Sequence, residues 1–276
     1  MFYYINQAIG LVSYGNAFLA GLTGDVPPEL WPSYDTFGNA PYLRFVRRRR
    51  SGGDLAAADV LATNTGEWFR TLKRAGATRL RLLQTNDQTP DYFSLVDTFG
   101  GPYACVIGTD APDGEAWAHR LEGGGRAGGE GITYAGTVLH TPPPSRYPDV
   151  ASALATLHTA IEAALPVVES LQLEDHRRQW SAALDIVTRP RAPGLWFPGA
   201  RSNWYNPSAS RLMIAAAHVI VVDDPPWVII GDPSLYARWS AGVRPLYRAA
   251  SDALIAATNA FGDEQLSLPM TGRDFI

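Results

Sequence analysis

The sequence predicts an α+β protein, in which an antiparallel sheet built from hairpins and a meander carries amphipathic helices packed on one side. Two observations indicate this class: strand-like segments crowd into the first half of the chain, and helix-like segments with an apolar stripe dominate the second half. Strands in a run followed by helices in a run are typical of α+β folds, whereas α/β folds alternate the two. Because 46% of the residues are hydrophobic, the chain can build a sizeable core.

The first 24 residues contain no charged side chain, but polar residues and four glycines interrupt them. A secretion signal needs a positive segment before its apolar stretch, and a membrane-spanning helix needs about 20 predominantly apolar residues. The stretch meets neither requirement. It therefore predicts two buried segments joined by a glycine-rich bend, with no membrane association. The single cysteine, Cys105, excludes a disulfide within the chain and favours a cytoplasmic location.

Two predicted hairpins contain a similar sequence motif. Residues 34–37 and 42–48 are predicted strands around the turn Gly-Asn-Ala-Pro, and residues 92–99 and 103–109 are predicted strands around Gly-Gly-Pro. Both hairpins contain Asp-Thr-Phe-Gly. Glycine tolerates the backbone angles of tight turns and proline cannot donate to a sheet ladder, so similar hairpins need similar turn residues. The repeat indicates common hairpin construction, and a remote duplication is the alternative.

Helical sequence lies between the two hairpins. Asp54 is the predicted cap of a helix over residues 55–62. Asn64 and Glu67 then resemble a capping box that opens a second helix, which ends at Gly76.

A predicted strand over residues 78–83 follows, because leucine and arginine alternate there. The meander continues with predicted strands over 103–109, 116–122 and 132–140, joined by a short turn and a glycine-rich loop.

Four helices are predicted in the second half. The first begins at Val150 and is bent or ended by Pro166, and the second covers residues 173–187. The third follows a Ser208 cap, and the last begins near Pro245 and stops at Gly262.

A proline-rich linker over residues 188–194 sets the predicted domain boundary. The sequence predicts a sheet domain over 1–189 and a mainly helical subdomain over 190–276, with one compact domain as the alternative.

Two stretches are candidates for recognition. One is the arginine run after Arg44, in which aromatic residues interleave, and the other is the loop 195–206, where aromatic side chains surround an arginine and an asparagine. Large aromatic residues and arginine dominate binding hot spots. The predicted partner-binding residues are Arg44, Arg47, Arg49, Trp196, Arg201, Asn203, Trp204 and Tyr205.

The sequence favours a function without catalysis, cofactor or metal. The common catalytic and nucleotide-binding motifs do not occur, and the five histidines lack the spacing of metal ligands. The alternative is a hydrolase that uses Asp and His from separated segments, such as Asp223, in an aromatic-lined pocket near Trp204. A Cys105 pair with His119 or His140 would need the strands to bring them together.

The predicted function is that of a soluble binding protein acting through a protein–protein interface, and bacterial immunity or inhibitor proteins are one class that fits. Its predicted partner is another protein, whose acidic surface would complement the arginines. The net charge of −4 and the lack of a nucleic-acid-binding motif disfavour nucleic acid, which is a second alternative through Arg44–Arg50.

Overall fold

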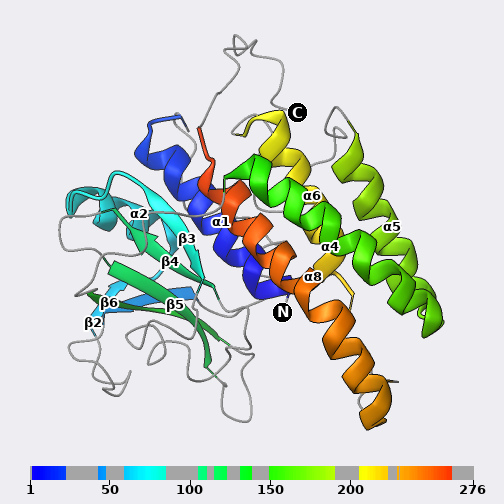
Figure 1. Cartoon of the computed structure of the whole chain (residues 1–276). Coiled ribbons are helices and arrows are strands. Elements are labelled where there is room, and N and C mark those ends of the chain that lie inside the picture. Colours follow the sequence, from blue (N-terminus) through cyan, green and yellow to red (C-terminus); the bar gives the residue numbers. More distant parts are fainter. Residues whose placement is uncertain are drawn as a thin grey trace, which may run out of the picture.

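A mixed sheet lies beside a bundle of helices (Figure 1). The computed structural model describes residues 2–22, 43–47, 59–84, 105–110, 115–122, 131–138, 149–189, 205–222, 229 and 231–262. The strands in these ranges are β1 (Leu43–Arg47), β2 (Asp59–Ala62), β3 (Leu80–Gln84), β4 (Cys105–Thr109), β5 (Glu115–Glu122) and β6 (Gly131–Val138). The helices are α1 (Phe2–Leu19), α2 (Thr65–Arg74), α4 (Val150–Ser170), α5 (Glu174–Thr188), α6 (Pro207–Ile220) and α8 (Pro233–Asn259).

The strand order is β2-β1-β6-β5-β4-β3. Neighbouring strands are antiparallel, with the exception of β1 and β6, which are parallel. The chain is therefore a mixed α and β protein, as predicted, but a sheet that is antiparallel throughout is not confirmed. The physical reason is that a parallel pair needs a long crossover, which no local turn signal announces.

The helical bundle adjoins one edge of the sheet. Helix α2 packs against β2, α1 packs against β3 and β4, and the end of α8 packs against β3, which is the edge strand (Figure 1). Helices α4, α5, α6 and α8 pack mainly against one another. The prediction that the helices pack together on one side of the sheet is thus not confirmed.

Helix α1 replaces the two segments and the bend that the sequence predicts at the N-terminus. It is one helix from Phe2 to Leu19 despite its glycines. Gly15 explains why: a Cβ atom there would lie 2.4 Å from the Leu80 side chain and 2.9 Å from that of Phe69. Glycine is therefore needed for close packing of α1 on β3 and α2, and that packing outweighs its low helix propensity.

The segment from Asp59 to Ala62 is strand β2, so the prediction of a helix over 55–62 is wrong there. Pairing with β1 overrides the helix propensity of its alanines. The next helix, α2, confirms the prediction of a capping signal: the Asn64 side chain accepts a hydrogen bond of 2.8 Å from the backbone N–H of Glu67. Gly76 follows the helix with a φ of 84°, as its C-terminal position requires.

Two of the bundle helices, α4 and α8, contain a proline in their interior. Helix α4 continues past Pro166 to Ser170, and α8 begins at Pro233, well before Pro245. Both prolines are exposed, so each ring lies on an outer face, where the helix can bend without disturbing the core. Helix α6 is capped by Asn206 and not by Ser208.

Helix α4 is, among the described helices, the one long and apolar enough to cross a membrane by length and composition alone. It packs against α5, α6 and α8, and a core helix of a soluble bundle passes the same test.

Two groups of aromatic side chains fill the interior. Under the sheet, Phe45 stacks on Trp68 with ring centroids 4.3 Å apart, and Trp117 meets Trp68 edge-on at 5.5 Å. In the bundle, Trp180 and Trp239 lie 5.9 Å apart. All five rings are buried, so each group stabilises its half of the molecule through apolar area removed from water.

Candidate functional site

The two described arginines of the predicted basic run do not form one surface. Side chains alternate along a strand, so Arg44 and Arg47 of β1 lie on opposite faces of the sheet. Arg44 donates a hydrogen bond of 3.0 Å to Thr133 Oγ1 of β6. Arg47 forms an ion pair of 2.5 Å with Glu115, a carboxylate whose side chain is only 7% exposed. Much of the charge of Arg47 is therefore already balanced within the chain.

Among the partner-binding residues predicted in the loop 195–206, Tyr205 is the one that the structure describes, and it belongs to the core. Its side chain is 7% exposed, and its hydroxyl shares a hydrogen bond of 2.7 Å with Ser13 Oγ of α1. Its ring meets that of Phe261 edge-on at 5.8 Å. Tyr205 thus anchors the end of the loop to α1 and to the chain after α8, and it presents no side chain to a partner.

Most of the other residues predicted for recognition or chemistry lie outside the described residues: Arg49, Trp196, Arg201, Asn203, Trp204, His140 and Asp223. Cys105 and His119 lie in strands β4 and β5, but their side chains are not described.

Tyr205 gives the protein a predictable response to alkali. Burial raises the pKa of its phenol well above the ordinary value, and the hydrogen bond with Ser13 opposes this only in part. The pKa of this phenol is higher in the folded state than in the unfolded state, where it is about 10. Its contribution to the stability of the fold is therefore complete below about pH 10 and is lost as the pH rises further. The stability advantage of the wild type over Tyr205→Phe should therefore shrink above about pH 10. Urea denaturation between pH 8 and pH 11 measures it, with the exposed Tyr236→Phe as control; an advantage that does not shrink contradicts the assignment.

The three histidines whose side chains are described lie in separate places. His158 lies 3.3 Å from Glu162 on the outside of α4, and His218 Nδ1 lies 2.8 Å from Gln179 Oε1 between α6 and α5. His176 is buried edge-on against Trp180 and Trp239. Among the residues that the structure describes, no three His, Cys, Asp or Glu side chains are placed to hold a metal ion.

A surface that the sequence did not point to lies on the N-terminal half of α8. One side of this half packs tightly on the bundle: Trp239 is buried, and a Cβ atom on Gly242 would lie 2.6 Å from the Val167 side chain of α4. Arg238 also donates a hydrogen bond of 2.8 Å to Ser170 Oγ at the end of α4. These contacts fix the orientation of the helix.

The opposite side of this half of α8 is exposed. We call it the basic face of α8, and it consists of Ala237, Ala241, Arg244 and Arg248, together with the exposed Tyr236 at its border. Arg244 donates a hydrogen bond of 2.9 Å to the Tyr236 hydroxyl and lies 6.0 Å from the centroid of its ring. No acidic residue occurs between positions 233 and 251, so the charged side chains of this stretch are all arginines.

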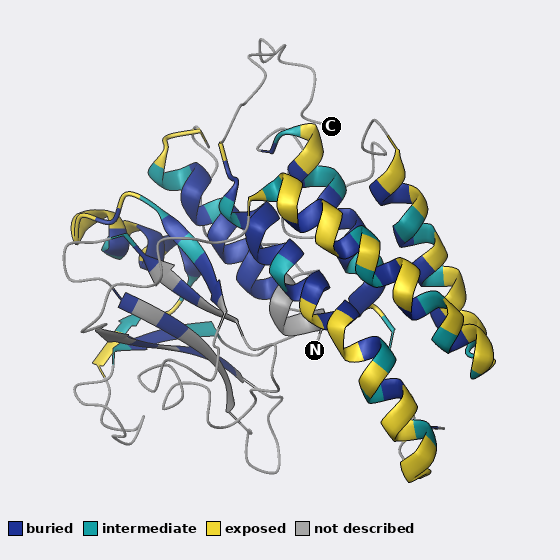
Figure 2. Ribbon diagram, in the orientation of Figure 1, coloured by how far each residue is buried: buried dark blue, intermediate teal, exposed yellow. Residues whose placement is uncertain are grey.

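The figures show how accessible this face is. The N-terminal half of α8 projects beyond the other bundle helices (Figure 1), and its outer side is exposed along this length (Figure 2).

An acidic residue lies beyond each end of the basic face of α8. Asp232 caps the helix, and burial raises the pKa of the Asp252 carboxyl, an effect that the charge of Arg248 partly opposes.

Comparison with known proteins assigns the chain to no family. No protein-family model matches it, and no significant match was found among curated proteins or solved structures. A function for this chain is therefore inferred from its own surfaces.

The sequence did contain a signal for the basic face. Asp232 followed by Pro233 is a common start of a helix, with a capping side chain and then proline in the first turn. Continued from there, helical spacing places Arg244 and Arg248 one turn apart, on the same side as Ala237 and Ala241. Starting the helix near Pro245 conceals this pattern.

Proposed function

We propose that this chain is a non-enzymatic binding protein that acts through a protein–protein interface, and that the basic face of α8 is the surface that meets the partner. The observation that carries the proposal is the exposure of Tyr236, Arg244 and Arg248 together on a projecting helix. Immunity and inhibitor proteins are one class of protein that works by such binding.

The composition of the face supports binding to protein. Tyrosine and arginine are enriched among the residues that dominate interface energies, because each combines a large contact area with directional hydrogen bonds. Tyr236 is 38% exposed, so a partner can bury apolar area of its ring without a change in the conformation of the helix. The contact with Tyr236 orients the Arg244 guanidinium before binding, which reduces the entropy lost on association.

The charge of the face defines the partner. Two exposed arginines within one helical turn complement carboxylates, and an arginine can bind a carboxylate through two parallel hydrogen bonds. The partner that we propose is a protein with an acidic surface segment. Such complementarity speeds association and selects against basic or neutral partners.

The loop 195–206 is the second proposed contact region. Its end is fixed by Tyr205 beside Phe261, which follows the C-terminal end of α8. The basic face lies on the N-terminal half of the same helix, so the two regions can be tested separately.

Site-specific photo-crosslinking in cells tests which region meets a partner. A photoreactive residue replaces Tyr236 on the basic face, Trp204 in the loop or Val60 on strand β2, which is exposed and distant from α8. We expect crosslinks from position 236 to an acidic segment of one protein, and none to that protein from position 60. Crosslinks from position 204 alone would move the interface to the loop, and crosslinks of 236 to a basic segment would contradict the proposed partner.

A further inference from the structure

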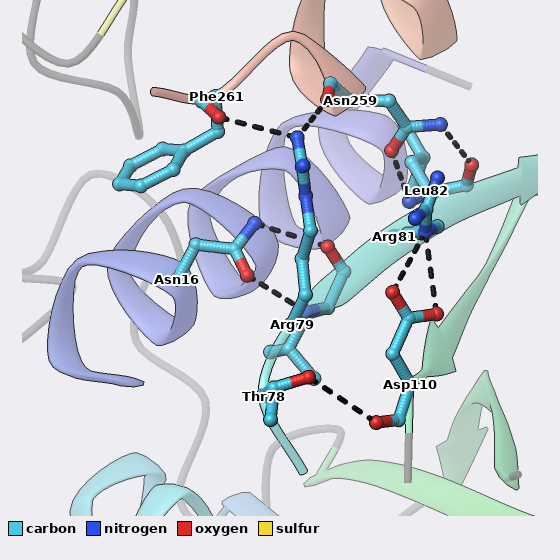
Figure 3. Close-up of polar contacts among 9 residues, drawn as sticks. Asn16, Thr78, Arg79, Arg81, Leu82, Asp110, Asn259 and Phe261 are labelled. Carbon is cyan, nitrogen blue, oxygen red and sulfur yellow. Dashed lines mark hydrogen bonds and ion pairs between the residues drawn. The ribbon is translucent and has the colours of Figure 1, made fainter. Parts of the chain in front are cut away.

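Strand β3 forms one edge of the sheet, and side chains from two helices occupy its free side (Figure 3). The Asn16 amide of α1 binds both backbone groups of Leu80. Its Oδ1 accepts a hydrogen bond of 2.7 Å from the Leu80 N–H, and its Nδ2 donates one of 3.0 Å to the Leu80 carbonyl. These are the two bonds that a residue of a neighbouring strand would make.

The Asn259 amide, at the end of α8, makes the same two hydrogen bonds with the backbone of Leu82. Its Oδ1 accepts a hydrogen bond of 2.8 Å from the Leu82 N–H, and its Nδ2 donates one of 2.9 Å to the Leu82 carbonyl (Figure 3). Leu80 and Leu82 are two positions apart, so their backbone groups point to the same side of β3. The two amides thus occupy successive pairing positions, as a strand would.

Further polar contacts hold the end of α8 at this edge. Arg79 donates hydrogen bonds to the carbonyls of Asn259 and Phe261, the latter at 3.1 Å. Beside these contacts, Asp110, which follows β4, forms an ion pair of 3.0 Å with Arg81 of β3 (Figure 3). Asn16 is only 3% exposed, so the first amide lies inside the molecule, whereas the second lies half-buried at the rim.

We infer that Asn16 and Asn259 act as a substitute strand that keeps β3 from pairing with other chains, and that β3 is a latent site of self-association whose partner is a second copy of this chain. Unpaired edge strands are templates for pairing, and proteins protect them by covering them or by satisfying their backbone groups. Every copy carries the same strand, and two copies of β3 can pair antiparallel around a two-fold axis. When the end of α8 moves away from β3, the Asn259 amide leaves the backbone groups of Leu82. Strand β3 of a second copy can then make these hydrogen bonds.

The test compares Asn259→Ala and Asn16→Ala with the wild type. At concentrations at which each variant is monomeric, native-state hydrogen exchange should show faster exchange, by at least about tenfold, at the Leu82 amide in Asn259→Ala and at the Leu80 amide in Asn16→Ala. The other of the two amides should stay protected in each variant. Sedimentation velocity over a range of concentrations should show a larger average mass than for the wild type at the same concentration.

A matched control separates loss of the amides from loss of stability. Val168 is fully buried in α4, so Val168→Ala destabilises the bundle and leaves both asparagines in place. We expect its average mass to equal that of the wild type. Association of Val168→Ala to the same extent as Asn259→Ala, or unchanged mass of Asn259→Ala, would overturn the inference. Asn259 is half-buried at a helix end, so this variant decides the question even where Asn16→Ala does not fold.

Discussion

Trp117→Ala is expected to lower the free energy of unfolding by about 3–5 kcal/mol, the range for truncating a large buried aromatic side chain. Trp117 has no exposed surface and contacts Phe45 and Trp68, while its indole covers Gly136 so closely that a Cβ atom there would lie 2.7 Å away. Alanine would leave a cavity between the sheet and α2 that these neighbours cannot fill without moving.

Urea denaturation followed by far-UV circular dichroism measures the effect of Trp117→Ala. Trp117→Phe is the control, because it keeps most of the ring area and should lose less stability. A loss for the alanine variant below about 1 kcal/mol, the size of an average substitution, would contradict the packing described for this side of the sheet.

Trp180→Ala is expected to cost about as much, again about 3–5 kcal/mol, although it lies in the bundle. Its ring is fully buried against Trp239 and His176, and its indole N–H donates to the carbonyl of Val219 in α6. The cavity would lie between α5, α6 and α8, and the Val219 carbonyl would lose the hydrogen bond from the indole.

The two tryptophan variants together test whether sheet and bundle unfold as one unit. The Asn259 amide and the Arg79 guanidinium join α8 to β3, so either substitution should shift the whole transition. Tryptophan fluorescence and circular dichroism should then report the same midpoint in each variant. Two separate transitions, with only one displaced in each variant, would contradict this coupling of sheet and bundle.

Elements with local signals were predictable from the sequence. Asn64 and Gly76 flank a single helix, α2, and strands β3 to β6 correspond to predicted strands. Elements set by distant contacts were not. Glycine has a low helix propensity, yet α1 needs Gly15 in order to approach β3 closely. The parallel pairing of β1 with β6 joins Arg44 to Thr133, which is 89 positions away.

The candidate site shows the same division. An arginine run in sequence predicts a basic surface, but strand alternation separates Arg44 from Arg47, and Glu115 of β5 neutralises the latter. Tyr205 was grouped with its aromatic neighbours in the loop, while its hydroxyl partner, Ser13, lies 192 positions away. In contrast, the basic face of α8 follows from helical spacing once the helix start at Asp232 is recognised.

The most direct test of the proposed function is the affinity of the purified chain for the acidic protein crosslinked at position 236, measured by isothermal titration calorimetry. Arg244→Glu with Arg248→Glu should weaken binding at least about tenfold, and added salt should weaken wild-type binding. The control makes the same charge change on α5, at Arg177 and Arg178, which are already paired with Glu174 and Asp175, and it should bind like the wild type. Equal affinity for the wild type and the Arg244/Arg248 variant would contradict recognition through the basic face of α8.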